Sequence, residues 1–146
     1  MVQQSTQTAQ DVLVEEFSFF DDWIDRYQYI IDLGRSVSPM DESLKNDETK
    51  VTGCQSQVWL HAERRGDVLH FEATSDSTIV TGLIATLMRV YNDRTPQEIL
   101  ATKPDYVSQI GLDQHLSPTR RNGLSAMLER IFAVALAESR AAVSQS

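Results

Sequence analysis

Residues 57–73 read QVWLHAERRGDVLHFEA, and this stretch decides the fold class. Successive side chains alternate between two faces up to Glu63, and they alternate again after a turn at residues 65–67. The positions that share one face are Val58, Leu60, Ala62, Leu69, Phe71 and Ala73. Two runs of period two around a short glycine turn are typical of a β-hairpin. With a short neighbouring strand that begins near Lys50, the pattern predicts a small antiparallel sheet of three strands.

Helical patterns precede and follow this hairpin. Before the hairpin, they predict helices over residues 11–20 and 22–33. After it, they predict a helix from Ser75 or Asp76 to about Tyr91 and a short one that follows the Thr95-Pro96-Gln97-Glu98 capping signal. Two more are predicted from Pro104 to near Gly111 and from Ser117-Pro118 onward. Gly34 follows the last apolar residue of the second helix, where a left-handed cap is expected. The order of helices, small sheet and helices predicts an α+β fold in which the sheet packs against the helices.

The composition describes an ordinary soluble protein with one domain. The chain has 146 residues, of which 41% are hydrophobic and 23% charged, and its formal net charge is −8. This charge argues against nucleic-acid binding, which depends on lysine and arginine neutralising phosphates. Residues 1–10 are expected to form a flexible polar tail, and residues 11–146 the single domain. We expect no signal peptide and no membrane helix, and a cytoplasmic location.

Cys54 is the only cysteine, and it lies in the run VTGCQSQVW at residues 51–59. A single thiol excludes an internal disulfide and most thiolate metal sites. It leaves three roles open: a nucleophile, a carrier of one group, or a small buried core residue. Glycine on one side and hydrogen-bonding residues on the other place the thiol on a loop that leads into a strand.

Several stretches, in the same order along the chain, resemble the SufE family of sulfur-acceptor proteins. They cover residues 27–34, 51–59, 75–84, 114–120 and 123–124, and the resemblance extends over residues 17–137. The run from Gly53 to Trp59 is the most specific of them. The resemblance implies the fold that this family shares with iron–sulfur scaffold proteins such as IscU.

The resemblance also implies a function. Cys54 is expected to take persulfide sulfur from a cysteine desulfurase of the SufS or CsdA type, to stimulate that enzyme, and to pass the sulfur to a scaffold complex of the SufBCD type. Pyridoxal phosphate belongs to the desulfurase, so we expect neither a cofactor nor a metal in this chain. Family analogy permits a homodimer.

Six residues are predicted to support Cys54 or to bind the partner. Gly53 allows the donor backbone to come close, and the amides of Gln55 and Ser56 are placed to stabilise a thiolate. Asp76 is either a helix cap or a residue near the thiol. Arg120, in the first turn of the last helix, is expected to form an ion pair, either within the fold or with the desulfurase. His115 is expected to pack on the start of the last helix.

Two other classes of function stay open on the sequence. A hydrolase or acyltransferase would use Cys54 with His115 as a cysteine–histidine pair. A pure interaction module would leave the thiol incidental. His61 and His70 are interpreted as surface residues of the predicted hairpin.

Overall fold

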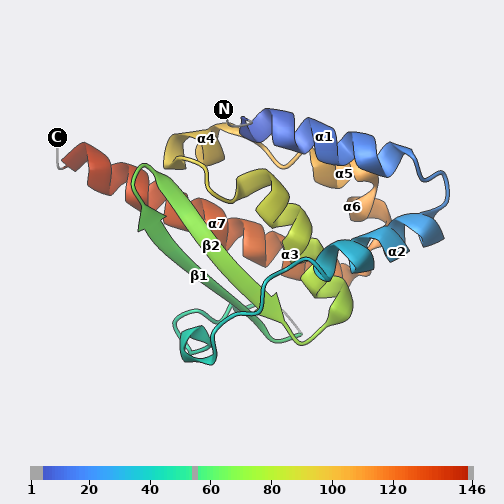
Figure 1. Cartoon of the computed structure of the whole chain (residues 1–146), viewed down its shortest axis with the longest axis horizontal. Helices are drawn as coiled ribbons and strands as arrows, with labels where there is room; N and C mark the ends of the chain where they lie inside the picture. Colours follow the sequence, from blue (N-terminus) through green and yellow to red (C-terminus); the bar gives the residue numbers. More distant parts are fainter. Residues whose placement is uncertain (1–4, 54–55, 145–146) are drawn as a thin grey trace.

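The computed structural model describes residues 5–53 and 56–144 of the chain, which form an α+β fold (Figure 1). The elements, in chain order, are α1 (Thr6–Ser18), α2 (Trp23–Gly34), the 3-10 helix η1 (Glu42–Leu44), β1 (Val58–Arg65), β2 (Val68–Ser75), α3 (Thr78–Tyr91), α4 (Pro96–Ala101), α5 (Tyr106–Ile110), α6 (Leu112–His115) and α7 (Pro118–Ser144). Figure 1 shows α3 in the middle of the molecule, between the hairpin and the pair formed by α1 and α2.

The hairpin is formed as the alternating pattern predicts. Strands β1 and β2 pair antiparallel from Val58 opposite Ser75 to Arg65 opposite Val68, and Gly66 supplies the left-handed turn residue with φ +62°. The prediction of three strands is wrong for the described residues, where the sheet has two. Near Lys50 there is only an isolated bridge to Trp59, because the chain turns away after a few residues instead of running alongside β1.

Helix α3 is the central element of the hydrophobic core. Ten of its residues are buried, among them Leu83, Leu87 and Tyr91, and only a helix that is apolar on nearly every side can be enclosed in this way. Its N-cap is Ser77, whose side chain accepts a hydrogen bond from the backbone N–H of Val80. Ser75 and Asp76 therefore do not cap this helix, contrary to one of the two predicted roles of Asp76.

Helix α2 crosses α3 at two glycines. Gly34 is buried in the last turn of α2, and a Cβ added to it would lie 2.8 Å from the backbone nitrogen of Gly82. A Cβ on Gly82 would lie 2.6 Å from Cγ2 of Ile30 and would overlap the Ile30 carbonyl oxygen. The predicted left-handed cap at Gly34 is wrong, since this glycine is helical and serves close packing between two backbones.

Helix α1 begins earlier than the sequence pattern indicates. It starts at Thr6 because Ser5 caps it by accepting from the N–H of Thr8, and Thr6, Ala9 and Gln10 are buried. Gln10 fastens this turn to α5, since its amide donates to the Lys103 carbonyl and accepts from the Tyr106 N–H. Residues 6–10 are thus part of the packed fold rather than of a flexible tail, and residues 1–4 lie outside the described residues.

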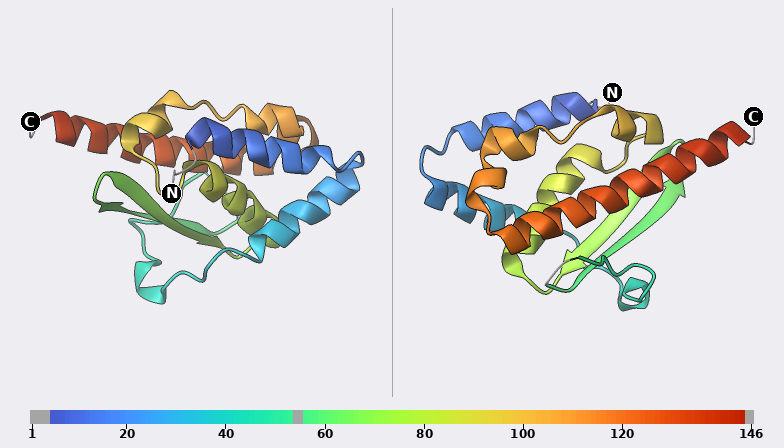
Figure 2. Two further views of the ribbon diagram at one scale, coloured as in Figure 1. Left: turned by 45° about the horizontal axis from the view of Figure 1, so that its top comes forward. Right: turned by 180° about the vertical axis from the view of Figure 1, so that it is seen from behind.

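The C-terminal half has the predicted helices α4, α5 and α7, and in addition the short helix α6, which was not predicted. The capping box of Thr95 and Glu98 opens α4, and Gly111 at φ +95° separates α5 from α6. Helix α7 begins at Pro118 and runs along the hairpin to the C-terminal end, as both views in Figure 2 show. None of the helices in the described part of the chain is long and apolar enough to cross a membrane.

Candidate functional site

The chain on either side of Cys54 is held by backbone pairing. Val51 donates its N–H to the carbonyl of Val58 at 2.9 Å, and Leu60 donates to Thr49 at 2.8 Å. The residues between this pairing, 52–57, are called the thiol loop below. Cys54 and Gln55, predicted as the acceptor and as a thiolate-stabilising residue, lie outside the described residues. The site is therefore built from the two arms of the thiol loop and their neighbours.

The arm that enters the thiol loop is fastened to α7 by Arg130. Its guanidinium donates to the carbonyl of Lys50 at 3.5 Å and to the carbonyl of Glu48. The turn before it is closed by Asn46, whose side-chain oxygen accepts from the N–H groups of Glu48 and Thr49. Arg130 was not predicted from the sequence, because no local pattern connects it to a segment some 80 residues earlier.

The arm that leaves the thiol loop is fastened to the start of α3 by Asp76. The Asp76 carboxylate accepts from the backbone N–H of Gln57 at 3.0 Å, and the Asp76 N–H donates to the Gln57 carbonyl at 3.3 Å. Of the two roles predicted for Asp76, the structure supports the position beside the thiol loop. The carboxylate fixes the residue where the loop joins β1.

A small pocket adjoins the thiol loop at Ser56. It is lined by residues from α3 and the first turns of α7: Val80, Leu83, Thr119, Arg120, Gly123, Leu124 and Met127. Gly53, at φ +90°, lies against the same helix, since a Cβ on it would be 3.4 Å from Cβ of Ala126. A side chain at position 53 would be strained in this conformation. Gly53 and Ser56 thus both lie beside α7, which carries Arg120, and their predicted roles in supporting Cys54 stay predictions.

Arg120 forms a hydrogen bond within the fold, and the predicted alternative of an ion pair with the desulfurase stays a prediction. Its Nη1 donates to the phenol oxygen of Tyr27 on α2 at 2.9 Å. Because a neutral phenol accepts the bond, the positive charge of this half-buried side chain is not neutralised by that partner. The pocket beside Ser56 thus has a cationic group on its wall.

His115 lies beside the start of α7, as its place in the chain requires, and its ring contacts α2. It is the last residue of α6, and its exposed ring stacks on Trp23 with the centroids 4.3 Å apart and an interplanar angle of 17°. This stacking fixes the ring against the first turn of α2. Cys54 lies outside the described residues, so the cysteine–histidine pair of the hydrolase alternative stays a prediction.

The comparisons with known proteins decide the family. A family model described as "SufE: Fe-S metabolism associated domain" matches residues 11–135, most of the chain. The chain belongs to the SufE family. An uncharacterized SufE-like protein of Rhizobium meliloti (strain 1021) is 41% identical over 129 residues, covering 85% of this chain and 92% of that protein. One of Rhizobium etli is 41% identical over 126 residues, covering 83% and 85%.

A solved structure supports the fold of this SufE-family chain. The solution structure of a hypothetical protein from Thermus thermophilus matches with a TM-score of 0.72, covering 87% of this chain and 93% of that one. Sequence identity is 21%, so this likeness concerns the fold alone. The family match associates the chain with iron–sulfur metabolism, and the solved structure supports the α+β fold.

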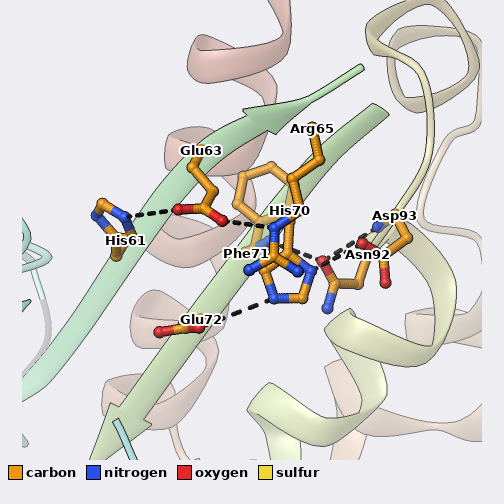
Figure 3. A network of polar contacts seen from close by, with 8 residues as sticks. All are labelled: His61, Glu63, Arg65, His70, Phe71, Glu72, Asn92 and Asp93. Carbon is orange, nitrogen blue, oxygen red and sulfur yellow. Dashed lines mark hydrogen bonds and ion pairs between the residues drawn. The ribbon is translucent and has the colours of Figure 1, made fainter. Parts of the chain in front are cut away.

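The remaining histidines of the SufE-family domain lie on the outer face of the hairpin (Figure 3). His70 Nδ1 lies 2.7 Å from a carboxylate oxygen of Asp93, and His61 lies 3.8 Å from Glu63. Arg65 lowers the pKa of the Glu63 carboxyl, mainly through a hydrogen bond. Across residues 5–53 and 56–144, no group of three or more histidine, cysteine, aspartate or glutamate side chains is arranged to hold a metal ion.

Proposed function

We propose that this protein is a sulfur acceptor that takes persulfide sulfur from a cysteine desulfurase onto Cys54, stimulates that enzyme, and delivers the sulfur to an iron–sulfur scaffold. One observation carries the proposal. The only cysteine of a SufE-family chain lies in a six-residue loop whose two arms are fastened to α7 and to the start of α3. A loop on fixed arms presents a thiol to a partner without refolding the domain.

The transfer is a thiol exchange in which atoms and electrons balance. The Cys54 thiolate attacks the terminal sulfur of the donor persulfide, and a new sulfur–sulfur bond forms at Cys54 as the donor bond breaks. The electron pair leaves with the donor thiolate, and the proton of the terminal sulfur stays on the sulfur that moves. No net oxidation occurs, so no further reagent is required. The rate depends on the thiolate fraction, on the leaving group and on access.

The surroundings of the thiol loop suit this step. The guanidinium of Arg120 contributes positive charge to the wall of the pocket at Ser56, which favours a thiolate nearby. A chain with one cysteine has no second thiol to attack the bound persulfide and release its sulfur. The protein needs no cofactor of its own for the exchange, because the desulfurase and its pyridoxal phosphate supply the activated sulfur. We place the exchange in the reducing cytoplasm.

The test is stimulation of a purified desulfurase. Alanine formation from cysteine is followed with wild-type protein and with Cys54→Ser, after circular dichroism and thermal unfolding show that both are folded alike. Wild-type protein is expected to accelerate turnover, and Cys54→Ser to leave the basal rate unchanged. Equal stimulation by the two proteins would refute the proposal and favour an interaction module in which the thiol is incidental.

A further inference from the structure

Two large apolar side chains stand in solvent at one corner of the molecule. Phe19, in the connection from α1 to α2, is 80% exposed, and Ile24, in the first turn of α2, is 75% exposed. These are the largest exposures among the large hydrophobic residues of the described chain. The neighbouring Phe20 behaves differently, since its ring is half-buried and packs on Tyr29 with the centroids 4.9 Å apart. The ring of Phe20 therefore packs within the fold, whereas the ring of Phe19 lies in solvent.

The exposed pair is related to the thiol loop by residue spacing along α2 and by the hydrogen bond between Tyr27 and Arg120. Ile24 lies three residues before Tyr27, which is about 4.5 Å along the helix axis and on adjoining positions of its surface. Tyr27 accepts the hydrogen bond of Arg120, and Arg120 lines the pocket with Ser56. The surface from Phe19 through Ile24 and Tyr27 to Arg120 is called the α2 band below.

The charges around the corner indicate what kind of surface covers it. Asp21, Asp22 and Asp25 are all exposed beside the apolar pair. A second copy of the chain docked corner to corner would bring these carboxylates against their own copies, which costs free energy. The guanidinium of the nearby Arg26 donates its hydrogen bonds to the carbonyls of Phe20 and Ile110, so it does not neutralise these carboxylates. The corner fits an apolar socket with a basic rim on a different protein.

We propose that the α2 band is the docking surface for the sulfur donor, with Phe19 and Ile24 as apolar anchors and the aspartates facing lysine or arginine of the desulfurase. The inference rests on the proposed function. A standard interface covers about 800 Å² of each partner, so the two anchors are expected to be part of a larger contact. Aromatic and arginine side chains carry a large share of binding energy at interfaces, and the band supplies Phe19, Tyr27 and Arg120.

The test compares two double variants of the full chain. Phe19→Ser with Ile24→Ser removes the anchors, and Leu100→Ser with Leu136→Ser removes two exposed apolar residues from α4 and α7, which are 39% and 42% exposed. Binding of each to a purified desulfurase is measured by calorimetry, and stimulation is measured over a range of protein concentrations. The anchor variant is expected to bind about tenfold more weakly. Its half-saturating concentration rises, whereas its stimulation at saturation stays normal. The control variant keeps wild-type affinity.

The charge part of the inference has its own variant. Asp21→Asn with Asp25→Asn keeps Asp22, which caps α2. It is expected to slow association about threefold at low salt and to lose that difference at high salt, as charge steering requires.

Four outcomes overturn the inference. If wild-type protein binds the desulfurase and accepts sulfur, and the anchor variant binds with unchanged affinity, the α2 band is refuted as the docking surface and the proposed function stays intact. Equal losses in both apolar variants show a general effect of polar substitution. A wild-type dimer that the anchor variant converts to a monomer, with desulfurase affinity unchanged, assigns the corner to a second copy. If wild-type protein neither binds nor accepts sulfur, the proposed function fails together with the inference.

Discussion

Helix α3 and the thiol loop are neighbours in the fold, but they are held in place by different forces. Helix α3 is enclosed by apolar side chains and by a backbone crossing in which there is no space for a methyl group at Gly82. The thiol loop is held at its two arms by hydrogen bonds from Arg130 and Asp76, near the surface. We therefore expect the stability of the fold and the proposed sulfur transfer to depend on separate residues, so that each can be changed while the other is kept.

The largest effect is expected at the crossing of α2 and α3. Gly82→Ala places a Cβ against the Ile30 carbonyl and should lower the free energy of unfolding by about 3 kcal/mol or more. Denaturant titration measures this loss, and the fraction that remains folded should accept sulfur normally. Gly66→Ala is the control, because its Cβ meets nothing within 4 Å and only the left-handed backbone costs about 1 kcal/mol. Equal losses in the two variants would contradict the role of the crossing.

The entering arm should show the opposite behaviour. Arg130→Gln is too short to hold the carbonyls of Glu48 and Lys50, so the rate of sulfur acceptance is expected to fall about tenfold while stability falls by less than about 1 kcal/mol. Arg130→Lys should recover part of the rate. Arg35→Gln is a matched control on an exposed arginine that pairs with Asp32. Single-turnover kinetics measure the rate, and a wild-type rate in Arg130→Gln would show that the arm does not position the thiol.

A fall in pH should lower the stability of the packed helices by protonating Glu16. The hydrogen bond from Arg89 is the main cause of a lowered pKa for this carboxyl. Because the folded pKa lies below the unfolded value near 4.5, the pair stabilises the fold above about pH 4.5, and this contribution is lost as the pH falls through the folded pKa. Glu16→Gln should cost roughly 1 kcal/mol at neutral pH and flatten the acid dependence. Parallel curves for the two proteins between about pH 6 and pH 3 would refute this.

The smallest effect is expected at the leaving arm. Asp76→Ala removes the acceptor for the Gln57 N–H and should slow sulfur acceptance about threefold. Asp76→Asn keeps an oxygen at that position and should retain most of the rate. The same single-turnover assay separates the two variants. Since Ser77 rather than Asp76 caps α3, neither should change the unfolding midpoint noticeably, and a clear drop in the midpoint would return Asp76 to a capping role.

The local parts of the molecule were predictable from the sequence, and the contacts between distant segments were not. The hairpin and the capping box at Thr95 follow from patterns within a few residues. The N-cap of α3 was misassigned because Ser75, Asp76 and Ser77 are all capping residue types, and only the backbone path selects Ser77. The third strand was overestimated, since a single bridge at Lys50 looks the same in sequence as the start of a strand.

For the site, the family resemblance predicts Cys54 as the sulfur acceptor, and the structure shows how the two arms of its loop are fastened. Gly53 and Ser56 lie beside α7, which carries Arg120, and their supporting roles stay predictions. The hydrogen bonds of Arg130 and the stacking of His115 on Trp23 join segments far apart in the chain, and such contacts leave no periodic signal. The close packing of the two glycines at the crossing of α2 and α3 could likewise not be predicted from the sequence.

The most direct test of the central claim is the mass of the protein after it has met its donor. Wild-type protein is incubated with an active desulfurase and cysteine, and its intact mass is measured without reductant, followed by peptide mapping. The account predicts a gain of one sulfur atom on the peptide that contains Cys54, reversed by reductant and absent in Cys54→Ser. No gain of sulfur, or a gain that persists in Cys54→Ser, would contradict it.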